Sequence, residues 1–315
     1  MAGIVWTLEG HNGDMWNLSE SDRGVRIARD GMTGLISAPV KTLYDEHAFQ
    51  RGATYRGKRF QPRQFVLGLD VYGSGDPWVP GLGDGTWQEV ASDVQSALDF
   101  DKPAYLHAES ESDYRTLEFR LSREIETHWK QDPGGINYGR MTITGTSGDP
   151  FYYGKTWHRT WESTTDTRSS DGSSPTGYTV ETGTIEVANP TNIPAYAFWE
   201  AQAPADDTQW ILPDYSFGSD EYGRATADAD RRIVLPPLMS GEHAWWATDP
   251  LHRDGPCGTV LNTPLYMRMR GVSFLYAIPP RTPATELPVA VSNAPAGTSV
   301  RVTVRHAYLN PFGEV

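Results

Sequence analysis

Only one stretch of this 315-residue chain repeats its apolar residues at the spacing of a helix. Between Trp87 and Asp99 apolar side chains return every three or four positions, Thr86 and Glu89 form a capping-box pattern, and Pro103 follows shortly after. We therefore predict one amphipathic helix, from about Trp87 to Asp99, that covers one face or edge of a sheet. A chain with so little helix must build its core mainly from strands.

The other apolar residues alternate with polar ones in short runs between turn signals. The run PRQFVLGLDVYG places Phe65, Leu67, Leu69 and Val71 on one face of a strand. The chain also holds 31 glycines and 23 prolines, and aromatic residues make up 11% of it, which favours many short strands joined by tight turns. The sequence predicts a mainly β fold.

The length allows two domains, each with its own core. We place an N-terminal domain of strands plus the helix at residues 1–163 and a C-terminal β-sandwich at residues 164–315. The segment TTDTRSSDGSSPTG, from Thr164, is polar and predicts a linker or a long exposed loop. Short strands then follow at near-regular spacing, among them PLYMRMRGVSFLYAIPP, which is typical of a sandwich or a jelly-roll-like domain.

Charge and cysteine content exclude several classes of function. The formal net charge of −13 opposes binding to phosphate backbones and anionic membranes. A single cysteine, Cys257, cannot form an internal disulfide. The first residues lack the pattern of a signal peptide, and no stretch approaches about 18 uncharged apolar residues. We expect a protein without membrane insertion and without affinity for nucleic acid.

The segment SGEHAWWATDPLHRDGPCG, residues 240–258, gathers residue types that active sites use. Glu242 and Asp249 would be the carboxylate pair of a glycoside hydrolase, which needs the two groups about 5 to 9 Å apart. On an extended strand, residues this far apart in sequence lie more than about 20 Å from each other. We therefore interpret both as solvated charges at strand ends.

A metal site would draw on His243, His252 and Cys257 in the same segment. Structural zinc sites usually repeat closely spaced ligand pairs, which this single cysteine cannot supply. The glycine-rich segment GSGDPWVPGLGDGTW lacks the lysine and the spacing of a phosphate-binding loop, so we predict a flexible loop that caps the helix. No GxSxG nucleophile motif occurs. We predict no catalytic residues, no metal and no cofactor, and a chain that is not an enzyme.

Trp245 and Trp246 are adjacent, so on a strand they point to opposite faces. One should enter the core of the sandwich. The other would be exposed, where it could contact a glycan, the first domain or a neighbouring subunit, since interfaces favour tryptophan.

The order of these signals resembles the distal tail proteins of long-tailed bacteriophages, especially those of actinobacterial hosts. In the first half, SDRGVRIARDGMTGLISAPVK, QFVLGLDVYG, the helix and the GDPFYYGK turn look like the family's N-terminal belt domain. In the second half, VANPTNIPAYAFWEAQ, RRIVLPPLMSGEHAWWATDP and LPVAVSNAPAGTSVRVTVRHAYLNPFG look like its galectin-like β-sandwich. The resemblance covers nearly the whole chain.

The resemblance implies a structural virion protein, made in the host cytoplasm, that forms a hexameric ring at the distal end of the tail. Its partners would be copies of itself, the tail tube protein, and the hub and fibre proteins of the tail tip or baseplate, with DNA only passing through a channel. Candidate ring-interface residues are Arg23, Arg26, Leu35, Trp87, Val90 and Val94. Candidate contacts to a partner or a glycan are Trp245, Trp246 and His252. The alternative function is a carbohydrate-binding module that recognises host cell-wall glycans through the C-terminal sandwich.

Overall fold

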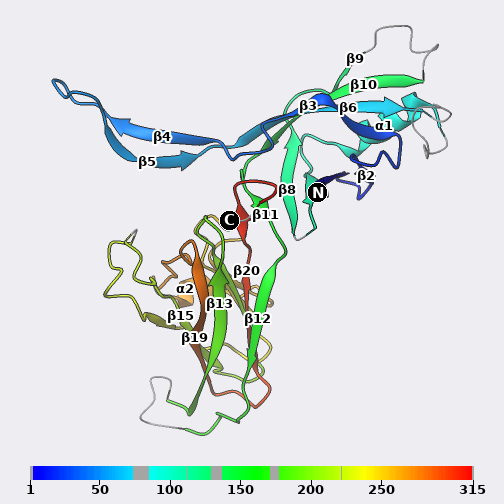
Figure 1. Ribbon diagram of the computed structural model, residues 1–315. Helices are drawn as coiled ribbons and strands as arrows, with labels where there is room; N and C mark the ends of the chain where they lie inside the picture. Colours follow the sequence, from blue (N-terminus) through cyan, green and yellow to red (C-terminus); the bar gives the residue numbers. More distant parts are fainter. Residues whose placement is uncertain are drawn as a thin grey trace. The chain divides into compact units, whose positions relative to one another are not determined.

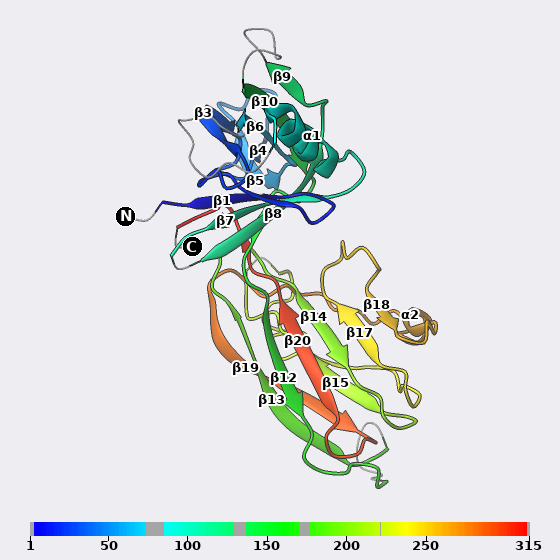
Figure 2. The same cartoon turned by 90° about the vertical axis from the view of Figure 1, so that its right-hand side faces the viewer.

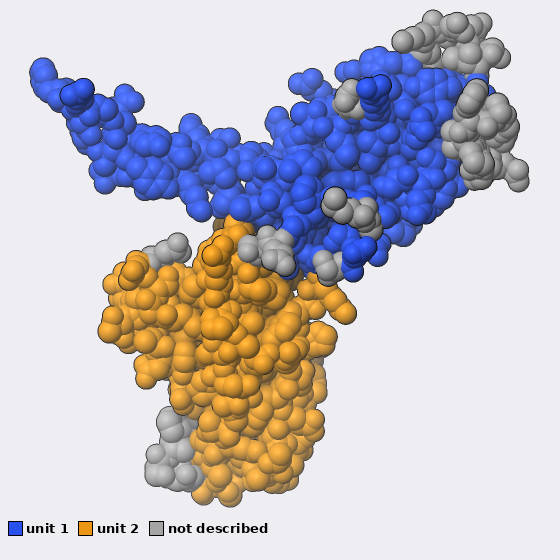
Figure 3. Space-filling model, in the orientation of Figure 1, with its two compact units in different colours: residues 1–154, 308–314 blue, residues 155–307, 315 orange. Residues whose placement is uncertain are grey.

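The computed structural model describes residues 3–73, 85–111, 113–128, 137–170, 177–220 and 222–313. Its contacts divide the chain into two compact units (Figure 3), one formed by Met1–Gly154 with Tyr308–Glu314 and the other by Lys155–Ala307. The division therefore falls earlier than the expected one after residue 163. The reason is that β12 (Trp157–Glu162) pairs along its length with β20 (Ser299–Val304) of the second unit.

The first unit is built on one large antiparallel sheet (Figure 1), whose main strand order is β2-β1-β7-β8-β10-β6-β3. Short strands β9 and β11 pair with β10 and β8, and β21 pairs with β11. A separate two-stranded sheet joins β4 to β5. The strands of this unit are β1 (Val5–Glu9), β2 (Met15–Asn17), β3 (Val25–Thr33), β4 (Val40–Asp45), β5 (Thr54–Phe60), β6 (Arg63–Tyr72), β7 (Ala104–Glu109), β8 (Tyr114–Leu121), β9 (Glu126–His128), β10 (Tyr138–Ser147), β11 (Tyr152–Tyr153) and β21 (Ala307–Tyr308).

Strand β6 confirms the prediction made from alternation. The side chains of Phe65, Leu67, Leu69 and Val71 are all at most 2% exposed and belong to one hydrophobic core. Neighbouring β10 pairs with β6 over its full length. Burying these four side chains stabilises this unit by about 25 cal/mol for each Å² of apolar surface removed from water.

The predicted helix is present as α1 (Trp87–Ala97), close to its expected bounds. Its capping box is formed: the Glu89 amide donates to Thr86 Oγ1 at 3.3 Å, and the Thr86 amide donates to Glu89 Oε2 at 2.7 Å. The helix buries Trp87 against β10, where Gly139 leaves room for the ring, because a Cβ atom there would lie 2.8 Å from it. The glycine-rich loop predicted before the helix falls largely at residues 74–84, outside the described residues.

The second unit is a β-sandwich of two antiparallel sheets (Figure 2), with strand orders β12-β20-β14-β17-β18 and β13-β19-β15-β16. Side chains from both sheets share one hydrophobic core, which includes Trp199, Trp210 and Trp246. Its other elements are β13 (Val180–Asn189), β14 (Ala197–Ala201), β15 (Gln209–Pro213), β16 (Arg232–Val234), β17 (Ala244–Ala247), β18 (Cys257–Thr259), β19 (Thr282–Ser292) and the short helix α2 (Leu265–Arg268). The mainly β prediction is confirmed; the galectin-like character of this sandwich stays an expectation.

Two details bear on the sequence predictions. The polar segment from Thr164 was predicted to be a linker or a long exposed loop. Its described part is a loop that connects β12 to β13 within the second unit, and residues 164–170 are exposed there except Thr167. Thr167 is fully buried there, and both its amide and its hydroxyl donate to the Ala294 carbonyl. In PLYMRMRG, predicted as a strand, residues 265–268 instead form α2. Neither described helix is long and apolar enough to cross a membrane.

The C-terminal segment is fixed to the first unit by two arginines. Arg63 has no exposed surface; it donates to the carbonyls of Leu35, Pro150 and Leu309 at 2.7, 2.8 and 2.9 Å. Arg115 donates to the carbonyls of Asn310 and Gly313 at 2.8 and 2.7 Å. Buried backbone carbonyls need donors, and a guanidinium can serve several at once.

Candidate interaction surfaces

Three of the six candidate ring-interface residues are core residues. Leu35, Trp87 and Val94 are at most 2% exposed and pack in the core of the first unit. A side chain with no exposed surface has no area left to bury against another subunit. These three residues therefore leave the set of candidate interface side chains. For Trp87 and Val94 the reason is that helical spacing identified the inward face of α1, whereas Leu35 lies between β3 and β4 and packs into the same core.

The other three candidates reach the surface. Arg23 stacks on the Trp16 ring at 4.7 Å, and Arg26 stacks on the Tyr72 ring at 5.0 Å. Both arginine side chains keep at least 40% of their surface exposed. Val90 on α1 is half-buried. Arg26 lies on β3, the edge strand of the large sheet, whose outer side has no strand partner among the described residues.

The β4–β5 hairpin is a surface that the sequence predictions missed. Its strands pair only with each other in the described chain, and Figure 1 shows them standing away from the large sheet of their own unit. Val40, Leu43, Tyr44 and Tyr55 are 42 to 56% exposed. An isolated two-stranded hairpin is marginally stable in water, so exposed apolar groups on one indicate a contact surface.

The hairpin also differs from the rest of the chain in charge. Residues 40–60 contain five Lys or Arg and two Asp or Glu, a formal charge of +3 in a chain whose total is −13. This local excess of basic residues was the signal by which the sequence could have identified the hairpin.

The two tryptophans of β17 point to opposite faces, as predicted. Trp246 is fully buried in the core of the sandwich. Trp245 lies on the other face and forms a three-ring cluster with Phe198 and His252, with ring centroids 5.4 to 5.5 Å apart. Its ring also lies against Gly258 of β18, where a Cβ atom would be 2.6 Å from it. The cluster holds the loop after β17 against the sheet and occupies much of the Trp245 ring.

We expect Trp245→Ala to lower the free energy of unfolding of the second unit by about 2 to 3 kcal/mol, because a half-buried aromatic and its ring contacts are lost. Urea unfolding measures the loss of stability, and hydrogen exchange in residues 249–256 reports whether the loop after β17 is released. Tyr266→Ala removes a 67% exposed ring and is the control, with an expected change within about 0.5 kcal/mol. An unchanged stability together with lost glycan binding would instead support the sugar-platform interpretation of Trp245.

Glu242 is not a solvated charge at a strand end, as the sequence suggested, but a buried one. Its side chain is 0% exposed and forms an ion pair with Arg268. It also accepts from the Met239 amide at 2.9 Å and from the Thr263 hydroxyl. Burial raises the pKa of Glu242, but the hydrogen bonds from Thr263, Met239 and Arg268 outweigh it and leave the pKa below its usual value. This is the environment of a structural carboxylate held ionised, not of a catalytic acid.

The candidate metal ligands make other contacts. His243 Nδ1 accepts from the Ala203 amide at 3.1 Å, and His252 belongs to the ring cluster. Cys257 lies on β18, and burial raises the pKa of its thiol. In the part of the chain that the structure describes, no three His, Cys, Asp or Glu side chains gather as metal ligands would.

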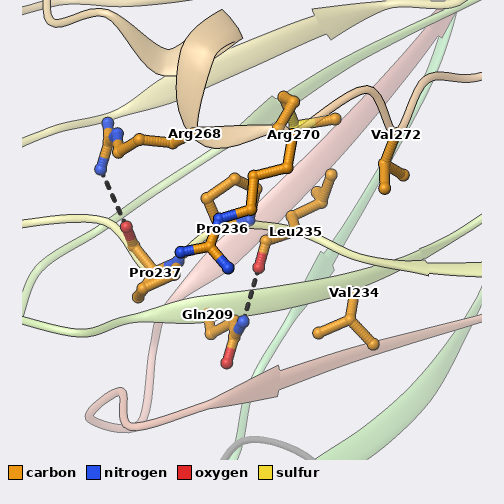
Figure 4. A pocket seen from close by; sticks show the side chains of 9 residues that line it. Gln209, Val234, Leu235, Pro236, Pro237, Arg268, Arg270 and Val272 are labelled. Atoms are coloured by element: carbon orange, nitrogen blue, oxygen red, sulfur yellow. Dashed lines mark hydrogen bonds between the residues drawn. The ribbon is translucent and has the colours of Figure 1, made fainter.

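A pocket of about 390 Å³ opens in the second unit beside α2 (Figure 4). Its walls come from Val234 at the end of β16, from the following Leu235-Pro236-Pro237 segment and from residues 268–272. The segment after β16 is fixed by two side chains. Gln209 Nε2 donates to the Leu235 carbonyl at 2.6 Å, and Arg268 Nη1 donates to the Pro237 carbonyl at 2.9 Å. Sequence reasoning did not find this pocket, because three separate segments form it.

Known proteins match this chain over nearly its full length, although no family model matches it. The chain is 26% identical to minor tail protein Gp27 of Mycobacterium phage D29 over 97% of both chains. It is also 26% identical to minor tail protein Gp27 of Mycobacterium phage L5, again over 97% of both.

Solved structures with the same fold come from phage tails. The Dit protein of phage SPP1, described as a paradigm of the hub adsorption apparatus in phages that infect Gram-positive hosts, superposes with a TM-score of 0.59. The match covers 97% of this chain and all of that one, at 10% identity. A chain of the phage p2 baseplate in its activated conformation matches with a TM-score of 0.53 at 9% identity, over 97% and 98% of the two chains. The predicted resemblance is therefore confirmed at two levels: in sequence the chain is similar to minor tail proteins of mycobacteriophages, and in fold it is similar to the Dit protein of phage SPP1.

Proposed function

We propose that this chain, a relative of mycobacteriophage minor tail proteins with the fold of a distal tail protein, is a structural component of a phage tail tip or baseplate. The full-length match to minor tail proteins carries this proposal. The relatives are named as minor tail proteins, which agrees with the expectation that this chain is not an enzyme. The environment of Glu242, a fully paired carboxylate, is consistent with the same conclusion.

We further propose that six copies form a ring in which the β4–β5 hairpin of one copy packs on its neighbour. A hairpin that docks on a different surface of the next copy makes a head-to-tail contact, and such contacts form a ring when the rotation between neighbouring copies closes after a whole number of copies. The hairpin carries positive charge and exposed tyrosines, whereas the rest of the chain is strongly acidic. Opposite charge favours this docking, and exposed Arg23, Arg26 and Val90 are further candidates for the same contact.

The ring would join the tail tube protein on one side to the hub and fibre proteins of the tip on the other, in the virion tail. Its centre would leave a channel for DNA. The net charge of −13 supports this arrangement, because acidic residues along a channel repel phosphate and keep passing DNA from binding.

The mass of the purified protein tests the ring. We expect native mass spectrometry and negative-stain imaging at micromolar concentration to show a six-fold ring. We expect the double variant Tyr44→Ala, Tyr55→Ala to shift the mass to the monomer, because both rings are more than half exposed and contact each other across the hairpin at 5.8 Å.

Tyr266→Ala is the matched control, because Tyr266 is an exposed tyrosine of the second unit and should leave the ring intact. A wild-type protein that stays monomeric at every concentration, and also after mixing with the tail tube protein, would refute the ring.

The alternative is that the second unit binds host cell-wall glycans. The only observation in its favour is a partly exposed tryptophan on the outer face of β17. Because that ring already stacks on Phe198 and lies against Gly258, it offers little free face to a sugar. A glycan array probed with wild-type protein and with Trp245→Ala decides between the two, and we expect no binding by either.

A further inference from the structure

Two arginines border the pocket beside α2, and only one of them has its charge neutralised. Arg268 forms an ion pair with buried Glu242 and donates to the Pro237 carbonyl at 2.9 Å. In the described part of the chain, no ion pair and no side-chain hydrogen bond joins Arg270 to another residue. Figure 4 shows the guanidinium of Arg270 directed into the pocket, above the hydrogen bond between Gln209 and Leu235.

The backbone turn at the end of α2 places Arg270 in this position. Its φ angle is 51°, in the left-handed region that residues with a side chain rarely adopt, and Gly271 follows at 81°. Arg270 lies in this turn and lines the pocket. An exposed arginine held in such a turn keeps its five donors available.

The pocket around this guanidinium is mainly apolar. Val234, Leu235, Pro236 and Pro237 form one wall, and Met269 and Val272 lie on the other side. Val234 and Val272 are 44% and 43% exposed. Next to the pocket on α2, Tyr266 and Met267 are 67% and 77% exposed. The site therefore offers apolar surface around one unpaired positive charge, in a protein that is otherwise acidic.

We propose that this pocket binds a segment of another protein that presents a carboxylate side chain beside an apolar one. The carboxylate would accept two hydrogen bonds from the Arg270 guanidinium, in the fork geometry that arginine and carboxylate share. The apolar side chain would fill the pocket against Val234 and Met269. A protein segment is the proposed occupant because neighbouring acidic and apolar side chains satisfy both the charge of Arg270 and the apolar wall, whereas a small inorganic anion would satisfy only the charge.

This inference rests on the proposed function, in that a tail protein needs surfaces for other tail proteins beyond its ring contacts. Its test uses a random 12-residue peptide display library panned on the intact chain. We expect the enriched peptides to share Asp or Glu next to an apolar residue. We expect Arg270→Gln, or the change of that acid to its amide in the peptide, to weaken binding about tenfold, the effect of one lost charge-assisted hydrogen-bond pair.

Arg253→Gln is the matched control, since Arg253 is another exposed arginine of the same unit and should bind the peptides as the wild type does. Three results would each overturn the proposal. The first is enriched peptides without an acidic residue, and the second is peptide binding that Arg270→Gln leaves unchanged. The third is loss of self-association in Arg270→Gln. The ring measurement separates the two proposals. If the protein forms a normal ring but binds no acidic peptides, only the proposed peptide site is refuted. If it binds acidic peptides but never forms a ring, only the proposed assembly is refuted.

Discussion

Arg63→Met should lower the free energy of unfolding of the first unit by about 3 kcal/mol and release the C-terminal segment from it. Arg63 is fully buried and donates to the carbonyls of Leu35, Pro150 and Leu309. Methionine fills a similar volume but leaves those acceptors unpaired, at about 1 to 3 kcal/mol for each buried group. Removal of a desolvated charge offsets part of this loss, since burial lowers the pKa of Arg63.

Hydrogen exchange measured residue by residue is the suitable readout, because two units need not unfold together. Protection should fall throughout the first unit and at residues 309–313. Arg120→Met is the control: its side chain is 43% exposed and pairs with exposed Glu118, so the expected change is within about 0.5 kcal/mol. Equal protection in Arg63→Met and the wild type would show that the arginine does not hold the C-terminal segment.

Glu242→Ala is expected to lower the free energy of unfolding of the second unit by about 3 kcal/mol. The change leaves Arg268, whose side chain is only 30% exposed, without its ion-pair partner, and leaves the Thr263 hydroxyl and the Met239 amide without their acceptor. Breaking a buried pair by removing one partner is strongly destabilising. Glu200→Ala removes one member of the exposed pair with Arg301 and should cost less than about 1 kcal/mol.

The loss in Glu242→Ala should depend on pH. The pKa of Glu242 lies below its ordinary value in the folded protein, so the native state favours the ionised form. Its contribution is therefore complete above the unfolded pKa of about 4.3 and is lost as the pH falls through the folded pKa. Urea unfolding at pH 7 and at successive pH values below 4 should show the wild type approaching the variant. A difference that stays constant over that range would contradict the assignment.

The sequence predicted those features that depend on neighbours along the chain. The capping box of α1 and the buried row from Phe65 to Val71 follow from local spacing, because the periods of helix and strand determine which side chains share a face. The same rule correctly separated Trp245 from Trp246. It also misled, since helical spacing selected Trp87 and Val94 as interface candidates although a stripe of that kind normally faces the core of its own unit.

Features that join distant segments were not predictable in this way. Glu242 meets Arg268 from a different element, and nothing in the spacing of the two residues indicates an ion pair. Arg63 contacts carbonyls from segments as far along the chain as Leu309. Such contacts depend on how strands are ordered in a sheet, and a single sequence does not state that order.

The sequence by itself therefore determined the mainly β composition of this protein, its one long amphipathic helix, its overall acidity and the resemblance to distal tail proteins. Only the tertiary structure decided that the β4–β5 hairpin stands exposed, that Glu242 is buried and paired, and that Arg270 faces an apolar pocket without a counter-ion in the described chain. The physical reason is that periodicity fixes which face of an element a side chain occupies, whereas burial and charge pairing depend on what packs against that face.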